Sequence, residues 1–204
     1  MLTASGLGYR LPTGRTLFEH VELRLDPGDA IAISGPSGTG KSTLLWLLGN
    51  LLTPTAGRVD ISADHPQPYA WVLQGLNVLS ARTLLDNSAL CNTIDGVPPR
   101  VARTRATEAV DALGLTSLAR TRLRNVSGGE LQRATVARAL ASTRPVILAD
   151  EPTNQLDRDN ARLVMELLDN ERHHNRVVVI VTHDTAALPS TIRRAELTPG
   201  GLVE

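Results

Sequence analysis

Nine residues, GPSGTGKST at 35–43, have the types and spacing of a phosphate-binding loop. Gly35, Gly40, Lys41 and Ser42 satisfy the pattern of a glycine, four residues, a glycine, a lysine and a serine or threonine. Glycines let backbone N–H groups approach phosphate oxygens, and a helix that begins in the loop points its positive end at the same anion. Lys41 adds charge toward the β and γ phosphates, and the Ser42 hydroxyl can ligate Mg²⁺. The stretch therefore predicts binding of a nucleoside triphosphate.

The use of lysine supports this interpretation over a glycine-rich turn with no ligand. Of the 21 basic side chains only Lys41 is a lysine, and a compact, strongly hydrated charge suits a phosphate better there than a planar guanidinium. The residues of the loop that are expected to contact the nucleotide are Gly35, Pro36, Ser37, Gly38, Thr39, Gly40, Lys41, Ser42 and Thr43.

Buried-strand patterns precede the loop and a pair of acidic residues. Residues 30–33 form an apolar run before the loop, and residues 146–149 form a second run that ends at Asp150 and Glu151. Ligands of a parallel sheet gather at the carboxyl ends of its strands. This pair is therefore where a metal ligand and a general base are expected.

Two further residues can be interpreted either as structural or as functional. His183 follows the apolar run 177–181, where a lone histidine is more often a packing or surface residue. Tyr9 is one of five aromatic residues and can either stack on an adenine or simply pack. Taken alone, neither residue distinguishes a functional role from a structural one.

Two other stretches are equally ambiguous. SGGE at 127–130 precedes a helical stretch and can be a second anion site, although such a sequence is more often a capping turn. The arginines at 120, 122 and 124 can form an anion patch, although solvated surface arginines are the simpler interpretation.

Length and composition predict an ordinary globular chain. Its 204 residues suffice for one sizeable core, and the single cysteine, Cys91, excludes an internal disulfide. We expect neither a membrane span nor a secretory signal, because no apolar run reaches 18 residues and the first residues lack a basic region. The net charge of zero gives no reason to expect nucleic acid binding.

Taken in order, the motifs resemble those of the ABC-type ATPases, the nucleotide-binding subunits of ATP-binding cassette transporters. The resemblance covers essentially the whole chain. It rests on Tyr9 at the place of the adenine-stacking aromatic, GPSGTGKST at 35–43, Gln74 between two subdomains, VSGGE at 126–130 as the signature, ILADEPT at 147–153, NQLD at 154–157 and His183 as the switch histidine.

The resemblance implies an ATPase that uses ATP and Mg²⁺. Ser42, Gln74 and Asp150 are expected at the metal ion, and Glu151 is expected to be the general base that activates the attacking water. The catalytic group as a whole is Glu151, His183, Lys41 and Gln74. The signature residues, which in this family bind the γ-phosphate held by a partner subunit, are Ser127, Gly128, Gly129 and Glu130.

The resemblance also implies an α/β fold. We expect a single ABC ATPase domain over 1–204, with a P-loop NTPase core of mainly parallel sheet and a small N-terminal antiparallel β subdomain. This core is predicted over 1–74 and 127–204, and an inserted α-helical subdomain over 75–126.

Partners follow from the same resemblance. We expect a homodimer or a paired ABC ATPase subunit, an integral membrane permease, and a peripheral location on the cytoplasmic face of the membrane. The compact size resembles the ATPases of lipoprotein-release, macrolide-export and cell-division complexes. The alternative is a soluble ABC ATPase that does mechanical or regulatory work on another protein assembly.

Overall fold

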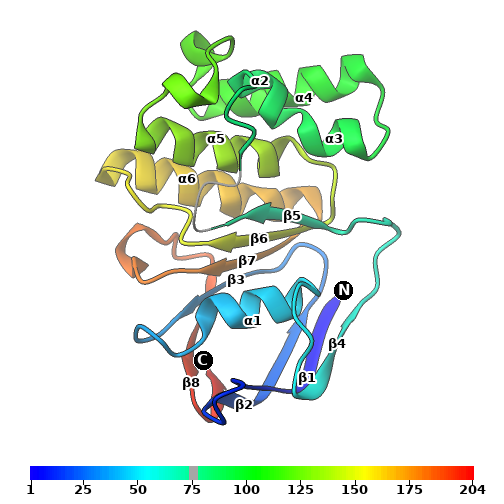
Figure 1. Cartoon of the computed structure of the whole chain (residues 1–204), viewed down its shortest axis with the longest axis vertical. Coiled ribbons are helices and arrows are strands. Elements are labelled where there is room, and N and C mark those ends of the chain that lie inside the picture. The colour runs from blue at the N-terminus through cyan, green and yellow to red at the C-terminus, as the bar shows by residue number, and fades with distance from the viewer. Residues whose placement is uncertain (74–77) are drawn as a thin grey trace.

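The computed structural model describes residues 1–73 and 78–204, and its main element is a six-stranded sheet (Figure 1). The strand order is β5-β6-β7-β3-β8-β9, with β9 antiparallel to β8 and the other neighbouring pairs parallel. The bounds of these strands are β3 Ala30–Ser34, β5 Tyr69–Val72, β6 Val146–Asp150, β7 Val177–Val181, β8 Arg193–Thr198 and β9 Gly201–Val203.

The three central strands are apolar and buried along their length, because helices or a second sheet cover both faces of the parallel sheet. Their register brings the ends of the strands level. Asp150 on β6 pairs with Val181 on β7, and Val181 pairs with Ile33 on β3. The carboxyl ends of β6, β7 and β3 therefore form one edge.

A second sheet is antiparallel and confirms the expected N-terminal strands. Its order is β2-β1-β4, with β1 at Leu2–Arg10, β2 at Thr16–Leu25 and β4 at Ala56–Ile61. Helix α1 (Lys41–Leu48) packs its leucines into the same apolar cluster as the buried face of this sheet and one face of the parallel sheet. Phe18 is fully buried in that cluster.

The opposite face of the parallel sheet is covered by helices (Figure 1). Their bounds are α2 Leu84–Ser88, α3 Leu90–Ile94, α4 Pro99–Ala112, α5 Gly128–Ala141 and α6 Arg158–Asn170, with short 3₁₀ turns at Thr116–Leu118, Leu123–Asn125, Glu171–His174 and Thr185–Ala187. Helices α2, α3 and α4 lie on the outer side of α5 and α6. The division of the chain at residues 75 and 126 remains a prediction.

One helix ends earlier than the leucine spacing predicts. Leucines continue to Leu52, but α1 stops at Leu48, and Asn50 has a left-handed backbone with φ of 56°. The N–H of Leu51 donates back to the carbonyl of Trp46 at 2.8 Å, which is the kind of bond that closes a helix C-terminus. Within the described part of the chain, no helix combines the length and apolar character needed to cross a bilayer.

Candidate active site

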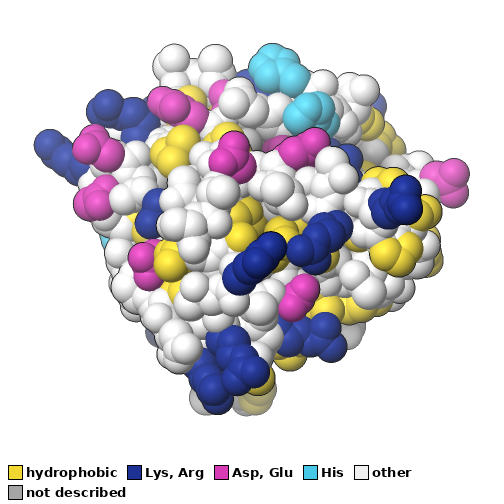
Figure 2. All heavy atoms as spheres, turned by 90° about the horizontal axis from the view of Figure 1, so that it is seen from above, with side chains coloured by type: hydrophobic (Ala, Val, Ile, Leu, Met, Phe, Trp, Pro, Cys, Tyr) yellow, Lys and Arg dark blue, Asp and Glu magenta, His cyan; other side chains and the backbone are white. Residues whose placement is uncertain are grey.

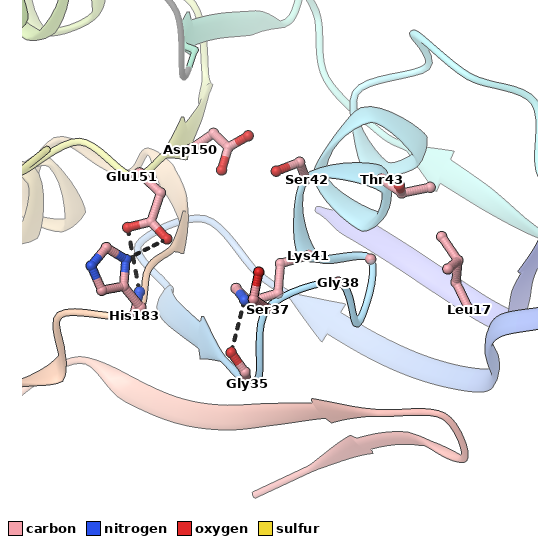
Figure 3. A pocket seen from close by; sticks show the side chains of 11 residues that line it. Leu17, Gly35, Ser37, Gly38, Lys41, Ser42, Thr43, Asp150, Glu151 and His183 are labelled. Carbon is pink, nitrogen blue, oxygen red and sulfur yellow. Dashed lines mark hydrogen bonds and ion pairs between the residues drawn. The ribbon is translucent and has the colours of Figure 1, made fainter.

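A pocket of about 680 Å³ lies where the carboxyl ends of the central strands meet the phosphate loop (Figure 3). Strand β7 separates β3, which leads into the loop, from β6, which ends in the acidic pair. The loop and the acidic pair therefore face each other across one strand. The pocket is lined by Leu17, Gly35, Ser37, Gly38, Gly40, Lys41, Ser42, Thr43, Asp150, Glu151 and His183.

The loop needs its glycines for backbone geometry. Gly40 has φ of 97° immediately before the first residue of α1, and a Cβ there would lie 3.1 Å from the side chains of Leu17 and Phe18. Thr39 closes the turn by donating its hydroxyl to the carbonyl of Pro36 at 2.9 Å. The helix N-terminus therefore opens directly into the pocket.

Lys41 lies over the loop rather than away from it. Its Nζ donates to the carbonyl of Gly35 at 2.8 Å and to that of Pro36 at 3.1 Å (Figure 3). An ammonium has three donors, so a third remains for a ligand, and a phosphate oxygen can replace either carbonyl. The group is thus held at the mouth of the pocket that an anion would enter.

Ser42 and Asp150 point toward each other across the pocket, from α1 and from the end of β6 (Figure 3). Burial raises the pKa of Asp150 above its usual value, while the hydrogen bond from Ser42 opposes that rise. A hydroxyl and a carboxylate are the oxygen ligands that Mg²⁺ accepts in phosphate sites, where substrate phosphates and waters complete its shell. These two residues fit a magnesium ion.

Glu151 is held by the strand next to its own. Its Oε1 lies 2.9 Å from His183 Nδ1, and its Oε2 accepts from the Thr182 hydroxyl at 3.1 Å and from the His183 N–H at 3.3 Å. The carboxylate is mostly buried, whereas the His183 side chain is 74% exposed. A buried, oriented carboxylate beside an exposed imidazole can position a water and a phosphate together.

Sequence reasoning missed two residues that position this carboxylate. Thr182 is fully buried and donates to it, and Gln132 on α5 donates to the backbone carbonyls of Glu151 and Pro152 at 3.4 and 3.1 Å. A polar residue between an apolar strand and His183 was the available signal for Thr182. Nothing in the spacing of α5 distinguishes Gln132 from a surface residue.

The signature lies at the N-terminus of α5, outside this pocket. Ser127 accepts from the N–H of Glu130, and the Glu130 carboxylate accepts from the N–H of Ser127 at 2.7 Å, which is a complete capping box. The hydrogen bond from the Ser127 backbone holds the pKa of Glu130 below its usual range. A Cβ on Gly128 would lie 2.4 Å from Oε1 of Gln155, while Gly129 has more room. The signature residues are exposed or partly exposed.

Tyr9, predicted to stack on the adenine, does not line the phosphate-loop pocket as the structure describes it, and of the predicted loop residues Pro36 and Thr39 are also absent from its lining. Tyr9 is half-buried and lines a separate cavity of about 350 Å³ together with Thr16, whose neighbour Leu17 lines the main pocket. Gln74, predicted at the metal ion, falls outside the described residues.

Comparison with known proteins decides the family. A family model described as "ABC transporter" matches residues 18–154. The chain belongs to the ABC transporter family. The ABC-type ATPase expected from the motifs and the P-loop NTPase fold are thereby confirmed.

Relatives of this ABC ATPase are transport proteins. The lipoprotein-releasing system ATP-binding protein LolD 1 of Rhodopirellula baltica is 36% identical over 100% of this chain and 96% of its own length. The LolD protein of Bacteroides fragilis is 36% identical over 90% of this chain and 91% of its own. The macrolide export ATP-binding/permease protein MacB of Rhodopseudomonas palustris is 34% identical over 97% of this chain, which spans only 33% of that protein.

Two solved structures of the bacterial ABC transporter cassette MJ0796 match the whole fold. A dimeric structure has a TM-score of 0.88 and 30% identity over 100% of this chain and 97% of the other. A dimeric post-hydrolysis structure with ADP and phosphate has a TM-score of 0.87 at the same identity and coverage. Both of these MJ0796 structures are dimers, and the second holds the products of ATP hydrolysis.

Proposed function

We propose that this ABC ATPase powers an integral membrane permease of the lipoprotein-release or macrolide-export kind from the cytoplasmic face of the membrane. The proposal is supported by relatives named as a lipoprotein-releasing ATP-binding protein and as a macrolide export ATP-binding/permease protein. Export or release, rather than uptake, is the direction that both names indicate.

A head-to-tail dimer with two ATP molecules at the interface is the proposed working form. The observation that carries it is the incomplete pocket: the described residues lining it supply a phosphate loop, an acidic pair and a histidine, whereas the signature lies elsewhere with its α5 N-terminus exposed. A helix N-terminus is a site for an anion. A second chain can bring Ser127 and the two following amides to the γ-phosphate.

The phosphate loop, the acidic pair and His183 have separate roles in each proposed site. Lys41 and the loop amides bind the β and γ phosphates, and Ser42 and Asp150 hold Mg²⁺, which would neutralise charge on the phosphates. Glu151 orients the attacking water and accepts its proton. His183, now bonded to Glu151, lies at the pocket edge where it can reach the γ-phosphate.

Three further roles complete the proposed site. Tyr9, which lines a cavity of its own, stacks on the adenine, because an aromatic ring offers a flat face to a base. Gln74 contacts the metal ion and senses the γ-phosphate. Glu130 fixes the signature turn through its capping bonds rather than by touching the nucleotide.

Replacing the proposed base tests the dimer. Glu151→Gln keeps the shape and the hydrogen bonds to the carbonyl oxygen but cannot accept a proton. We expect hydrolysis to fall about a thousandfold and ATP with Mg²⁺ to convert the chain from monomer to dimer in sedimentation. Glu166→Gln, an exposed change on α6, is the matched control and should behave as the original chain. A Glu151→Gln chain that binds ATP and stays monomeric at all concentrations contradicts the dimer.

The membrane partner is tested separately. Purification of the chain from membranes in mild detergent should bring with it an integral membrane protein. Recovery of soluble partners alone, from membranes and cytosol alike, would contradict the permease and favour the alternative of a soluble ABC ATPase acting on another protein assembly.

A further inference from the structure

One exposed arginine outside the predicted motifs reaches the phosphate loop. Arg15 lies in the turn between β1 and β2, and its Nη2 donates to the carbonyl of Gly38 at 3.5 Å. Gly38 is one of the residues that line the phosphate-loop pocket. A guanidinium that extends from the antiparallel sheet therefore lies at the edge of this pocket.

The backbone that carries Arg15 is fixed. Its carbonyl accepts from the N–H of Leu11 at 2.8 Å, and the N–H of Gly14 donates to the carbonyl of Leu11 at 2.9 Å. Gly14 supplies the left-handed conformation of this turn, with φ of 88°. A side chain that extends from an ordered turn loses less conformational entropy when it binds a ligand.

The start of β2 directs two side chains toward the loop. Leu17 is buried, lines the pocket and lies against the loop, where a Cβ on Gly40 would be 3.1 Å from its Cδ1 (Figure 3). Arg15 precedes Leu17 by two positions, and side chains at that separation along a strand point to the same side. The loop therefore meets an apolar side chain and a charged one from the same hairpin.

The guanidinium of Arg15 has donors left for a ligand. An arginine has five N–H donors, and the long bond to Gly38 uses one of them. In the part of the chain that the structure describes, Arg15 makes no ion pair, whereas Arg24 on the same sheet pairs with Asp26. Basic and acidic side chains are likewise interspersed on the helical end of the molecule (Figure 2). The charge of Arg15 is therefore available to an anion.

The pocket has little positive charge of its own. Of the described residues that line it, Lys41 is the one lysine or arginine, and it faces the carboxylates of Asp150 and Glu151. A triphosphate carries several negative charges, which a magnesium ion neutralises only in part. A second basic side chain at the pocket edge would therefore strengthen nucleotide binding.

We propose that Arg15 binds a phosphate group of the ATP molecule held in this pocket. Its guanidinium exchanges the long bond to a neutral carbonyl for a charge-assisted bond to a phosphate oxygen, which is shorter and stronger. The planar fork can donate to two oxygens at once, which suits a phosphate group. Arg15 is thus a binding residue and takes no part in the proton transfer to Glu151. This inference rests on the proposed function, which assigns the pocket to ATP.

ATP titration of the purified chain and of Arg15→Gln tests the contact. Loss of a charge-assisted hydrogen bond should weaken ATP binding about tenfold, and KM for ATP should rise by a similar factor while kcat stays within about twofold. Arg15→Lys keeps the charge without the fork and should bind ATP with an affinity between the two. High salt should narrow the difference between the original chain and Arg15→Gln, because it screens exposed charges.

Arg24→Gln is the matched control, because Arg24 is an exposed arginine toward the other end of β2. It should bind ATP as the original chain does. Adenosine, which has no phosphate, should compete with ATP with the same inhibition constant in every chain. Thermal unfolding without nucleotide should not change in Arg15→Gln, because this side chain is exposed, but ATP should stabilise the variant less than it stabilises the original chain.

Equal ATP affinity of Arg15→Gln and the original chain would overturn the inference, as would an equal loss in Arg24→Gln. A loss of adenosine binding as large as the loss of ATP binding also overturns it, because Arg15 would then act on the base or on the shape of the pocket.

Dimerisation of Glu151→Gln with ATP, measured alongside, separates this inference from the proposed function. If Glu151→Gln dimerises while Arg15→Gln binds ATP as tightly as the original chain, only the Arg15 contact is wrong. If Glu151→Gln stays monomeric while Arg15→Gln binds ATP more weakly, the contact stands and the dimer is wrong.

Discussion

Glu151 adopts a backbone conformation that few residues other than glycine take, and its neighbours hold it there. Its φ is 49°, its N–H donates to the carbonyl of Val181 at 2.8 Å, and Gln132 holds its carbonyl. Strain of this kind persists only where the surroundings over-determine it. The end of β7 thus fixes both the backbone and the carboxylate of the proposed base.

Thr182 should act as a positioning residue for that base. Thr182→Val keeps the buried volume and removes the hydroxyl that donates to Glu151, so we expect kcat for ATP hydrolysis to fall about tenfold with little change in KM. Thr182→Ser restores the donor and should recover most of the rate. Steady-state kinetics of the two variants measures the difference.

The serine variant also shows whether the hydroxyl of Thr182, rather than its packing, supports catalysis. If Thr182→Ser loses as much activity as Thr182→Val, the residue matters for packing and not for its hydrogen bond. If neither variant changes kcat, Glu151 is positioned by His183 and the backbone alone.

At the scale of elements, helix α5 is held at both ends. Its N-terminus carries the signature in a capping box, and its last carbonyls accept from side chains of α3, of α4 and of the residue before β7. Asn92 and Arg105 donate to the carbonyl of Ala141 at 2.8 and 2.9 Å, and Arg176 donates to that of Ala139 at 3.1 Å. Cationic donors at a helix C-terminus also complement its dipole. The position of the signature therefore depends on contacts at the far end of α5.

A buried ion pair joins the α3 end of the helical region to the sheet. The Asp95 carboxylate accepts two hydrogen bonds of 2.8 Å from the Arg144 guanidinium. The remaining nitrogen of that guanidinium, Nη1, donates to the carbonyl of Tyr69, and the Asp95 side chain is only 4% exposed. Asp95→Asn leaves a buried guanidinium without its charge partner, so we expect the free energy of unfolding to fall by about 3 kcal/mol. Urea denaturation near neutral pH measures it.

The pH dependence of that loss is a further check. The hydrogen bond from Arg144 lowers the pKa of Asp95, so the pair stabilises fully above the unfolded-state pKa of about 4 and loses its effect as the pH falls through the lower folded value. The two chains should converge in stability as the pH falls through the lowered folded-state pKa of Asp95. Asp60→Asn, at an exposed pair with Arg58, is the control and should cost under about 0.5 kcal/mol. An equal cost at both positions contradicts the buried-pair explanation.

The ends of a helix can be predicted from the sequence where a capping residue marks them, and not where no such residue is present. Asp157 is such a residue: it caps α6, which runs to Asn170, because its side chain accepts from the N–H of Asn160. The end of α1 has no proline or glycine to mark it, because Asn50 takes the left-handed conformation that closes the helix. Leu51 had the spacing of a core residue but is 60% exposed.

At the scale of the whole molecule, two inactive chains should complement each other if the sites lie between chains. Lys41→Ala disables a phosphate loop, and Ser127→Arg disables a signature. In a mixed dimer both defects fall in one site, and the other site is intact. Mixing the two chains should therefore restore ATP hydrolysis to about a quarter of the original rate, since about half of the dimers are mixed and each has one good site.

The control is a mixture of Lys41→Ala with Lys41→Ala, Ser127→Arg double-variant chains, in which no intact site can form. If the mixture of single variants is as inactive as this control while both chains still dimerise, each site is complete within one chain and the head-to-tail arrangement is wrong.

Residue types and spacings along short segments were enough to predict a phosphate loop, an acidic pair at a strand end and, from the order of the motifs, the family. The tertiary structure alone decided which groups meet. The shared register of Asp150, Val181 and Ile33 brings three distant strand ends level, and Thr182 reaches Glu151 across 31 positions of sequence. Packing of the sheet, which sums many weak long-range contacts, sets that arrangement, and no local spacing encodes it.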